Sequence, residues 1–441
     1  MQVWKFGGTS VGKPERMKSI RQLITEDGQP KVVVLSALSG TTNALLSITE
    51  SVNSNNITEA EAKATFLKDH YDSFIRELYL TEKGLNAGQE IINREFDYIQ
   101  KLIGTTPYSI KEEKEMVALG ELLSTQIFEA YLKEEGVDSL LLPALDFMVI
   151  DEDNEPIMWK IEENIAEILA PHEGKQIFIT QGFICRNPAG EVDNLKRGGS
   201  DYTASLIGGA IQAEEVQIWT DIDGMHNNDP RIVKNTFPIR ELSFAEAAEL
   251  AYFGAKILHP STITPAKMKG VPVRLKNTME PTAFGTLISE KSTDIEIKAI
   301  AAKDNITAIY IHSTRMLNAY GFLKRVFEVF EKYKTPVDMI TTSEVSVSVT
   351  IDQTTHLDAI MSDLREFAEL ENPDKDQVII CIVGNFWADK EGIAIKVLDA
   401  IKSIPIRMIS YGASEHNISL LVDAKHKNDA LNALNDGLFN K

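Results

Sequence analysis

Cysteine is nearly absent from this chain, which has only Cys185 and Cys381 among its 441 residues. The two cysteines lie far apart in the sequence, and neither belongs to a spacing that could hold a metal ion. The sequence therefore gives no disulfide framework, and such low usage is typical of a reducing cytoplasm. We expect each thiol to be a buried, inert side chain.

Positive charge is also scarce. The chain has 45 Lys and Arg against 65 Asp and Glu, which gives a formal net charge of −20 and a pI near 4.9. Nucleic acid and anionic membranes would repel such a chain at long range, so we expect neither as a partner. An anionic small molecule would need a local cationic pocket. The positions of the lysines and arginines therefore carry the functional argument.

Long apolar runs are missing as well. No stretch approaches the length of a membrane span, and the N-terminus lacks the basic and then apolar pattern of a signal peptide. With 43% hydrophobic and 25% charged residues, the composition is that of an ordinary soluble protein. We expect a cytoplasmic protein of two or three domains.

Strand-like and helical patterns alternate over roughly the first 280 residues. Apolar strands interleaved with helices predict an α/β fold in which a largely parallel sheet lies between helices. The predicted strands are Val3–Phe6, Val32–Leu35, Leu140–Leu142, Ile177–Thr180, Val216–Thr220 and Val273–Leu275, and the clearest helices are Thr58–Leu80, Glu90–Leu102 and Lys111–Glu135.

Periodicity is lost near Asn277–Asp294, where we place a domain boundary. Beyond it, a pattern of helix, strand, Ser-Glu and strand occurs twice at near-identical spacing, which predicts two βαββ-type α+β modules. Such a duplication suits a symmetric small-ligand or subunit interface, although two packed units with a purely structural role would give the same pattern. The helices begin near Gly321 and Gly392, and the strands are Val337–Ile340, Val345–Ile351, Ile406–Ile409 and Ile418–Val422.

The N-terminal segment Lys5–Val11 runs from an apolar strand through a lysine into a glycine-rich turn. A fixed cation and bare backbone N–H groups suit the oxygens of a phosphate. Gly7–Lys13 also reads G-x-x-x-x-G-K, but Pro14 follows where a P-loop requires Ser or Thr. Pro14 fits the first turn of a helix instead, so we interpret the segment as a phosphate site without a P-loop.

Two further loops follow predicted strands. In Arg197–Ala204 (RGGSDYTA), Arg197 could clamp a carboxylate or phosphate beside exposed N–H groups, whereas Asp201 taken alone is most simply a helix cap. Trp219–Gly224 sits at the carboxyl end of a strand, where open α/β sheets bind ligands. Its paired aspartates, Asp221 and Asp223, fit either magnesium association or simple turn formation.

Three isolated side chains complete the candidates. Lys256 lies in an apolar stretch, where it either reaches solvent or faces an anion. His259 precedes a proline and is more simply structural than catalytic. Glu121 interrupts the long predicted helix; it could pair with a substrate ammonium, although a solvated helix face is its default interpretation. Together, Lys5, Arg197 and Lys256 with three glycine turns describe a nucleotide phosphate site.

In their order along the chain, these motifs resemble those of aspartate kinase. The tail resembles the paired ACT domains of that family, and Val337–Val349 (VDMITTSEVSVSV) is most similar to its monofunctional, lysine-sensitive class. The resemblance covers essentially the whole chain. Its catalytic motifs are Lys5–Val11 (KFGGTSV), Ser36–Asn43 (SALSGTTN), Gly120–Thr125 (GELLST), Gln181–Phe183 (QGF), Arg197–Thr203 (RGGSDYT), Trp219–Gly224 (WTDIDG), Asp229–Arg231 (DPR) and Phe253–Pro260 (FGAKILHP).

The resemblance implies an amino-acid-kinase fold at residues 1–290 and a regulatory region at 298–441, with ACT domains near 310–375 and 376–441. It also implies transfer of the ATP γ-phosphoryl group to the β-carboxylate of L-aspartate, giving 4-phospho-L-aspartate, the first step towards lysine, threonine and methionine. Magnesium would arrive with the nucleotide, and no protein-held metal is expected. A carboxylate is already ionised at neutral pH, so positioning and charge neutralisation would be sufficient for catalysis.

Site residues follow from the same resemblance. Lys5 would contact the phosphoryl oxygens and Asp201 would organise the cationic centre, so these two are the catalytic candidates. Glu121 would take the substrate ammonium and Arg197 its α-carboxylate. His226 departs from the family, whose members often carry a tyrosine there. The full nucleotide set is Lys5, Gly7, Gly8, Thr9, Thr220, Asp221, His226, Arg231 and Lys256, and the aspartate set is Thr42, Glu121, Arg197 and Ser200.

For regulation, the resemblance implies an allosteric lysine pocket in the first ACT repeat. Asp338 and Glu344 suit a cationic ligand better than neutral threonine. Arg407 takes the place of Asp338 in the second repeat, so we expect one copy to bind lysine and the other to support contacts of a homodimer or a higher oligomer. The pocket would contain Met316, Phe322, Leu323, Val337, Asp338, Thr342, Ser343 and Glu344.

Two other functions stay open at this point. A kinase of the same fold could act on glutamate, acetylglutamate, carbamate or a nucleotide, but Glu121, Arg197 and the ACT tail favour aspartate. A catalytically inactive amino-acid sensor is a different class, and intact Lys5, Arg197 and Asp201 argue against it. The chain length leaves no room for a homoserine dehydrogenase half.

Overall fold

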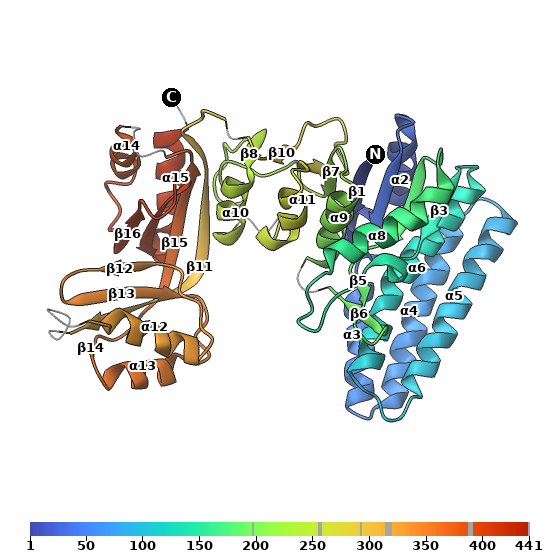
Figure 1. Ribbon diagram of the computed structural model, residues 1–441, viewed down its shortest axis with the longest axis horizontal. Helices are drawn as coiled ribbons and strands as arrows, with labels where there is room; N and C mark the ends of the chain where they lie inside the picture. The colour runs from blue at the N-terminus through green and yellow to red at the C-terminus, as the bar shows by residue number, and fades with distance from the viewer. Residues whose placement is uncertain (196–197, 255–257, 292, 314–319, 387–390, 440–441) are drawn as a thin grey trace. The chain divides into compact units, whose positions relative to one another are not determined.

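The structure is a computed structural model that describes residues 1–195, 198–254, 258–291, 293–313, 320–386 and 391–439. By its contacts the chain divides into two compact units, Met1–Gly224 with Leu258–Lys291, and Met225–Ile257 with Ser292–Lys441 (Figure 1). Among the described residues, none of the helices combines the length and apolarity needed to cross a bilayer.

The first unit is built on a sheet in the order β3-β4-β2-β1-β7-β9-β10. The first six strands are parallel and β10 is antiparallel to β9, which confirms the predicted, largely parallel sheet. A small hairpin of β5 (Ile184–Arg186) and β6 (Val192–Asn194) lies outside it. The strands are β1 (Gln2–Phe6), β2 (Lys31–Leu35), β3 (Ser139–Leu142), β4 (Ile177–Gln181), β7 (Val216–Thr220), β9 (Val273–Asn277) and β10 (Thr286–Ser289).

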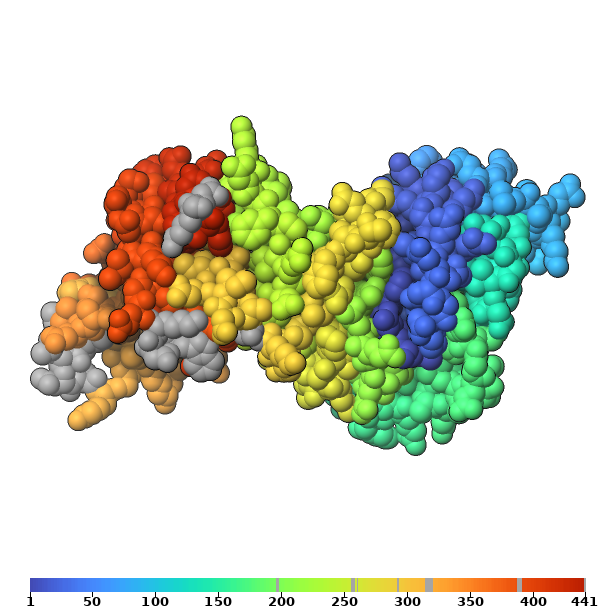
Figure 2. Space-filling view, turned by 90° about the horizontal axis from the view of Figure 1, so that it is seen from above, coloured from blue at the N-terminus to red at the C-terminus, as the bar shows by residue number. Residues whose placement is uncertain are grey.

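The strand order identifies the topological switch point of the sheet, the place where open α/β sheets bind ligands. β1 lies between β2, which follows it in the chain, and β7, which comes some 200 residues later. Connections therefore leave β1 and its neighbours in opposite directions, and the carboxyl ends of β1, β2 and β7 border a topological switch point. In the space-filling view, the yellow residues that follow 258 lie against the blue N-terminal residues (Figure 2). The reason is the strand order, in which β7 separates β9 from β1.

Helices cover the sheet of the first unit. Pro14 stands at the first turn of α2, as predicted. Two predicted helix limits are wrong: α4 ends at Leu78 because Tyr79 is extended, and α5 begins at Glu82, where the Thr81 side chain caps it. The helices are α1 (Gly8–Val11), α2 (Pro14–Glu26), α3 (Thr41–Asn53), α4 (Ile57–Leu78), α5 (Glu82–Ile103), α6 (Ile110–Glu134), α7 (Ala144–Phe147), α8 (Met158–Leu169), α9 (Gly199–Ala210) and α11 (Thr264–Met268), with 3-10 turns at Ala170–His172 and Pro260–Ile263.

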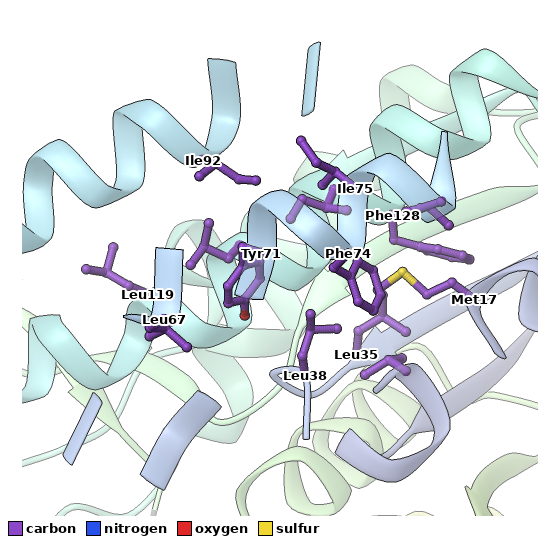
Figure 3. Packing of buried hydrophobic residues seen from close by; sticks show 14 of the residues in the cluster. Met17, Leu35, Leu38, Leu67, Tyr71, Phe74, Ile75, Ile92, Leu119 and Phe128 are labelled. Atoms are coloured by element: carbon purple, nitrogen blue, oxygen red, sulfur yellow. The ribbon is translucent and has the colours of Figure 1, made fainter. Parts of the chain in front are cut away.

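The main core of the first unit lies between the sheet and helices α2 to α6. Side chains of β2, α4 and α6 interdigitate there, and Figure 3 shows Tyr71 among Leu38, Leu67 and Leu119. The Tyr71 hydroxyl is fully buried but lies 2.9 Å from Thr41 Oγ1, which supplies its hydrogen-bond partner. This bond ties the start of α3 to the core.

The second unit holds a sheet in the order β12-β13-β11-β15-β17-β16, with β14 paired to β11. Each predicted βαββ module ends in a further helix, α13 or α15, which packs on the same core as the first helix of its repeat. The elements are β11 (Ile297–His312), α12 (Phe322–Lys332), β12 (Ile340–Thr342), β13 (Ser346–Ile351), α13 (Leu357–Arg365), β14 (Glu369–Leu370), β15 (Asp374–Gly384), α14 (Ile393–Ala400), β16 (Met408–Tyr411), β17 (Asn417–Asp423), a 3-10 turn (Ala424–His426) and α15 (Lys427–Leu438).

The middle strand of each repeat begins later than predicted, at Ile340 and Met408, so Asp338 and Arg407 precede their strands. The two positions are nevertheless equivalent. The Asp338 N–H donates to Thr350 O at 2.9 Å, and the Arg407 N–H donates to Leu421 O at 2.8 Å, in each case to the strand with which the following residues pair.

Residues 225–257 lie in the range 1–290 expected for the catalytic domain, yet they belong by contact to the second unit. They include β8 (Glu241–Ser243) and α10 (Phe244–Tyr252). The cause is a buried ion pair, in which Lys298 Nζ of β11 lies 2.7 Å from Glu246 Oε2 of α10, together with Val233 in the core of the second repeat. Removing either charged group would leave the other buried without its partner, so the pair fixes α10 on this sheet.

Candidate functional site

The centre of the candidate site is an ion pair at the carboxyl edge of the first sheet. Lys5 is in β1 and its Nζ lies 2.7 Å from Oδ1 of Asp201, in the first turn of α9. The two side chains are only 11% and 17% exposed, so each charge depends on the other for its stability. A carboxylate in the first turn also has a favourable position relative to the helix dipole. The structure thus brings together the two predicted catalytic residues.

Beside this ion pair the main chain has little room for a side chain at Gly7 and Gly8. A Cβ atom on Gly7 would lie 3.3 Å from Lys5 Nζ, and one on Gly8 would lie 3.0 Å from Ala37 O. The main chain after β1 can therefore approach the lysine ammonium with no side chain between them. A ligand with several anionic oxygens fits such a surface, because bare N–H groups and a cation are presented together.

The start of α9 packs against the turn after β4 by the same means. A Cβ on Gly182 would lie 2.4 Å from Ser200 Oγ, and one on Gly199 would lie 2.2 Å from the Phe183 ring. Gly198 has a φ of +72°, a left-handed conformation that favours glycine. These contacts hold the N-terminus of α9, with its partial positive charge, at the edge that contains Lys5.

Two predicted substrate residues are joined through Ser36 and Ala37, which lie in the Ser36–Asn43 motif but were given no role of their own. Glu121 Oε1 of α6 accepts from the Ala37 N–H at 3.2 Å, and the Ser36 hydroxyl donates to Ser200 Oγ at 3.0 Å. The Ser124 hydroxyl secures this link by donating to Ser36 O at 2.8 Å. The signal was present, because Ser36 is the first polar residue after the buried strand β2.

Glu121 is buried and only half satisfied. Among the described residues its Oε2 has no hydrogen-bond partner, and burial raises the pKa of this carboxyl to about 7. A cation placed at Oε2 would supply the missing partner and lower the pKa. Gly120 lets α6 come close to Ala37, since a Cβ atom added at Gly120 would lie 2.9 Å from Ala37 Cβ. Thr42, also predicted here, is half-buried at the start of α3, whereas Thr41 is the buried neighbour.

A small hollow lies beside β1 and β7. It brings together three of the predicted nucleotide residues: Thr9, Thr220 and Asp221. The Arg16 guanidinium lines it too and donates to Thr9 O. Arg16 was not predicted, although a cation one turn after a glycine loop was a usable signal. Across the hollow, Ser10 Oγ lies 2.8 Å from Thr278 Oγ1, which links the loop after β1 to the end of β9.

For four further predicted residues the structure gives no placement relative to this group. Arg197 and Lys256 lie outside the described residues. His226 and Arg231 belong to the second unit. There His226 Nδ1 lies 2.9 Å from Thr236 Oγ1, and exposed Arg231 donates to both oxygens of Asp229.

The predicted regulatory residues fall into two environments. Asp338 is fully buried as a side chain and accepts from Lys303 Nζ at 2.5 Å and from the Tyr252 hydroxyl at 2.7 Å. Phe322 is buried at the start of α12 and Val337 is half-buried. By contrast, the β12–β13 turn and the outer face of α12 are exposed at Leu323, Thr342, Ser343 and Glu344, while Met316 lies outside the described residues.

Comparison with known proteins agrees with this architecture. Residues 1–277 match the Amino acid kinase family, and residues 309–362 and 380–438 match an ACT domain. Lysine-sensitive aspartokinase 3 of Escherichia coli is 34% identical over 99% of this chain and 99% of its own length. The solved structure of E. coli aspartokinase III in complex with aspartate and ADP has a TM-score of 0.83 at 34% identity and covers 100% of both chains. The same enzyme with lysine and aspartate has a TM-score of 0.82 at 34% identity, covering 100% and 99%.

The raised pKa of Glu121 leads to a stability prediction. Its folded pKa of about 7 exceeds the ordinary value of 4.5, so its contribution to stability is present at low pH and is lost as pH rises through 7. Glu121→Gln should therefore stabilise the ligand-free protein by about 2–3 kcal/mol at pH 8 and by little at pH 4.5. Urea unfolding at both pH values measures this difference. Exposed Glu163→Gln in α8 is the control, and an equal effect of the two substitutions would contradict the prediction.

Proposed function

The chain belongs to the aspartokinases of the amino acid kinase family, and on this premise we propose that it transfers the γ-phosphoryl group of ATP to the β-carboxylate of L-aspartate. The product is 4-phospho-L-aspartate. The observation that carries the proposal is the buried Lys5–Asp201 pair beside two glycines that admit no side chain, at the switch point of a parallel sheet.

In this proposal, aspartate and ATP meet above the ends of β1 and β2. Glu121 takes the substrate ammonium at its open Oε2, and Ser200 lies on the same side through Ser36. Arg197 binds the α-carboxylate. These contacts leave the β-carboxylate directed towards the phosphoryl group. It is ionised at neutral pH and needs no base, so the gain in rate comes from alignment.

Lys5 has the electrostatic task. Charge spreads over the equatorial oxygens of the transferred group in the transition state, and a preorganised ammonium stabilises it there more than in the ground state. Asp201 holds the ammonium in place. The N–H groups of Gly7 and Gly8 and the hollow lined by Thr9, Thr220 and Asp221 provide the nucleotide side. Magnesium carried by the nucleotide would neutralise part of the phosphate charge.

A kinase for another acidic substrate is the competing proposal, and Glu121 distinguishes the two. It lies on a rigid helix whose approach is set by Gly120, so the distance between the ammonium site and the Lys5 ammonium is fixed by the fold. L-Aspartate, L-glutamate, N-acetylglutamate and carbamate should be compared in one coupled ADP-release assay. Turnover with an N-acylated substrate in preference to aspartate would contradict the role of Glu121.

Lys5 can be tested against Lys13, the residue that precedes α2. Lys5→Met should lower kcat about 10²–10³-fold, the usual loss for one preorganised charge donor. Exposed Lys13→Met, which removes the lysine that a P-loop interpretation would need, should leave kcat within about twofold. Because Lys5→Met leaves Asp201 unpaired, the double variant Lys5→Met with Asp201→Asn checks that the loss is not due to misfolding. Near-normal turnover of both Lys5 variants would refute the assignment.

We also propose that L-lysine inhibits the enzyme by binding in the first ACT repeat. The structure of E. coli aspartokinase III with lysine is described as the T-state. In this chain the support is electrostatic: Asp338 and Arg407 occupy equivalent hydrogen-bonded positions, so at this position the first repeat offers a buried carboxylate and the second a guanidinium. Inhibition requires lysine to favour a state of lower substrate affinity by about 1–3 kcal/mol, the usual range of allosteric coupling.

A titration tests this regulation. L-Lysine should inhibit aspartate-dependent ADP release, and L-threonine at the same concentrations should not, because its side chain is neutral. Asp338→Asn should raise the half-inhibiting lysine concentration at least tenfold while leaving uninhibited turnover in place, as a charge-assisted bond is lost. Arg407→Gln in the second repeat is the matched control. Inhibition that survives Asp338→Asn unchanged would locate the lysine site elsewhere.

A homodimer through the ACT region is proposed as well. The sheet of the second unit ends at β12 and β16, and these end strands carry exposed apolar residues: Ile340, Ile409 and Tyr411. Exposed apolar side chains gathered on two strands favour association with another copy. We further propose a cytoplasmic location, which agrees with two buried free thiols whose pKa values are raised by burial.

The oligomer can be measured directly. Light scattering after size exclusion should give a mass near twice the 49.1 kDa of the chain, or a larger multiple. Ile340→Asp with Ile409→Asp should shift the protein towards the monomer, because each change buries a charge in the interface. Trp159→Asp, which alters an exposed apolar residue of α8, serves as the control. A wild-type protein that stays monomeric at high concentration would refute the dimer.

A further inference from the structure

The carboxylate of Asp338 is the centre of a cluster drawn from separate segments of the second unit. Lys303 of β11 lies 2.5 Å from Asp338 Oδ1 and 3.0 Å from Asp352 Oδ2. The Tyr252 hydroxyl, from the last residue of α10, donates to the same Asp338 Oδ1 at 2.7 Å. Lys303 Nζ also lies 4.4 Å from the centre of the Tyr252 ring, a cation–π contact.

This cluster has one negative charge too many. Two carboxylates face one ammonium, and the hydroxyl is a neutral donor because burial and Asp338 raise the pKa of Tyr252 to about 12. Within the described residues, Asp338 Oδ2 and Asp352 Oδ1 are buried with no hydrogen-bond partner. A second ammonium would supply the missing charge and donors. Lys303 could then keep its bond to Asp352 while the incoming cation takes Asp338.

Tyr252 connects this cluster to a helix that is otherwise firmly held. Glu246 of α10 is paired with buried Lys298, and Glu249 accepts from the Ser414 hydroxyl at 2.9 Å and from Asn417 Nδ2 at 2.6 Å. Ser414 corresponds in the second repeat to Ser343, since each accepts from the N–H two residues later. The helix is thus attached to the second repeat by Glu249 and to the first by the Tyr252 hydroxyl.

The position of α10 in the chain gives this attachment a consequence. The helix ends at Tyr252, and Gly254 follows with a φ of +129°, where its Cβ would lie 2.2 Å from Ala302 O. Lys256, a proposed nucleotide residue, is four positions after Tyr252, and the chain passes into the first unit at Leu258. A change at the Tyr252 side chain is therefore made at the residue that leads directly into Phe253 and Gly254.

We propose that the Tyr252 hydroxyl and the effector ammonium compete for Asp338, so that Tyr252 is the positioning residue through which lysine acts on the end of α10. This inference rests on the proposed lysine regulation. A charged donor binds a carboxylate more strongly than a neutral hydroxyl, so the ammonium displaces Tyr252. At the equivalent position of the second repeat, Arg407 stands in place of the carboxylate and pairs with Asp374. Tyr252 stabilises the effector-free state and thereby sets the lysine concentration that is needed.

The test is Tyr252→Phe, which removes one oxygen from a half-exposed side chain. Uninhibited kcat and KM should stay within about twofold. The half-inhibiting lysine concentration should fall about fivefold, because lysine no longer displaces a hydrogen bond. Calorimetric titration with L-lysine should show the same fold-change in Kd. Tyr310→Phe is the matched control: it removes a hydroxyl that lies 3.4 Å from Asp374 in the same sheet, and it should change neither value.

Hydrogen exchange provides a measurement that would stay unchanged if Tyr252 had only a structural role. Lysine should speed exchange in the peptide covering residues 250–254 of the wild-type protein, and Tyr252→Phe should show that faster exchange already without lysine. An unchanged or raised half-inhibiting concentration in Tyr252→Phe would overturn the competition while leaving the lysine proposal intact. A wild-type protein that neither binds lysine nor is inhibited by it would overturn both.

Discussion

The first unit depends on one constraint, which is that the charge of Lys5 must be kept in a nearly closed interior. Water cannot solvate it well there, so Asp201 must lie against it, and α9 must begin where Asp201 reaches β1. The glycines follow from the same requirement. Gly7 and Gly8 leave one side of the ammonium open, and Gly182 and Gly199 let the start of α9 come close enough. A single ion pair therefore explains two glycine clusters that are separated by nearly 200 residues.

The second unit uses buried charge differently. The Glu246–Lys298 pair has no open side in the fold and serves to attach α10 to β11. The Asp338–Lys303 pair, by contrast, has a surplus carboxylate and two unsatisfied oxygens. The first arrangement fixes a helix, and the second leaves the same helix with an end whose partner can be exchanged. Because α10 has both kinds of attachment, it can stay docked while its last residue is released.

Local patterns in the sequence were enough for the six parallel strands of the first sheet and for the duplicated order of elements in the tail. The structure at runs such as Val32–Leu35 and at glycines such as Gly7 can be predicted from a few neighbouring residues. The contacts of α10 could not be foreseen, because nothing near Tyr252 or Glu249 indicates partners that lie about 90 and 165 residues away. Ser36 was overlooked for a milder reason: its role depends on Ser200, which only the pairing of β2 with β4 brings near. Long-range packing, not local propensity, decided these cases.

The substrate and effector carboxylates differ in what binding must replace. Glu121 has an oxygen with no partner in the described chain, and burial raises the pKa of its carboxyl to about 7. An arriving ammonium ionises it and gains the full interaction, because no protein group has to leave. Asp338 Oδ2 also has no partner in the described chain, but Asp338 Oδ1 already holds Lys303 and Tyr252. In the proposed competition, an arriving ammonium that replaces these bonds gains only the difference between its bonds and theirs. On that proposal, substrate binding is an addition and effector binding an exchange. An exchange responds to changes at the displaced group, which makes Asp338, rather than Glu121, the carboxylate suited to transmit a signal along the chain.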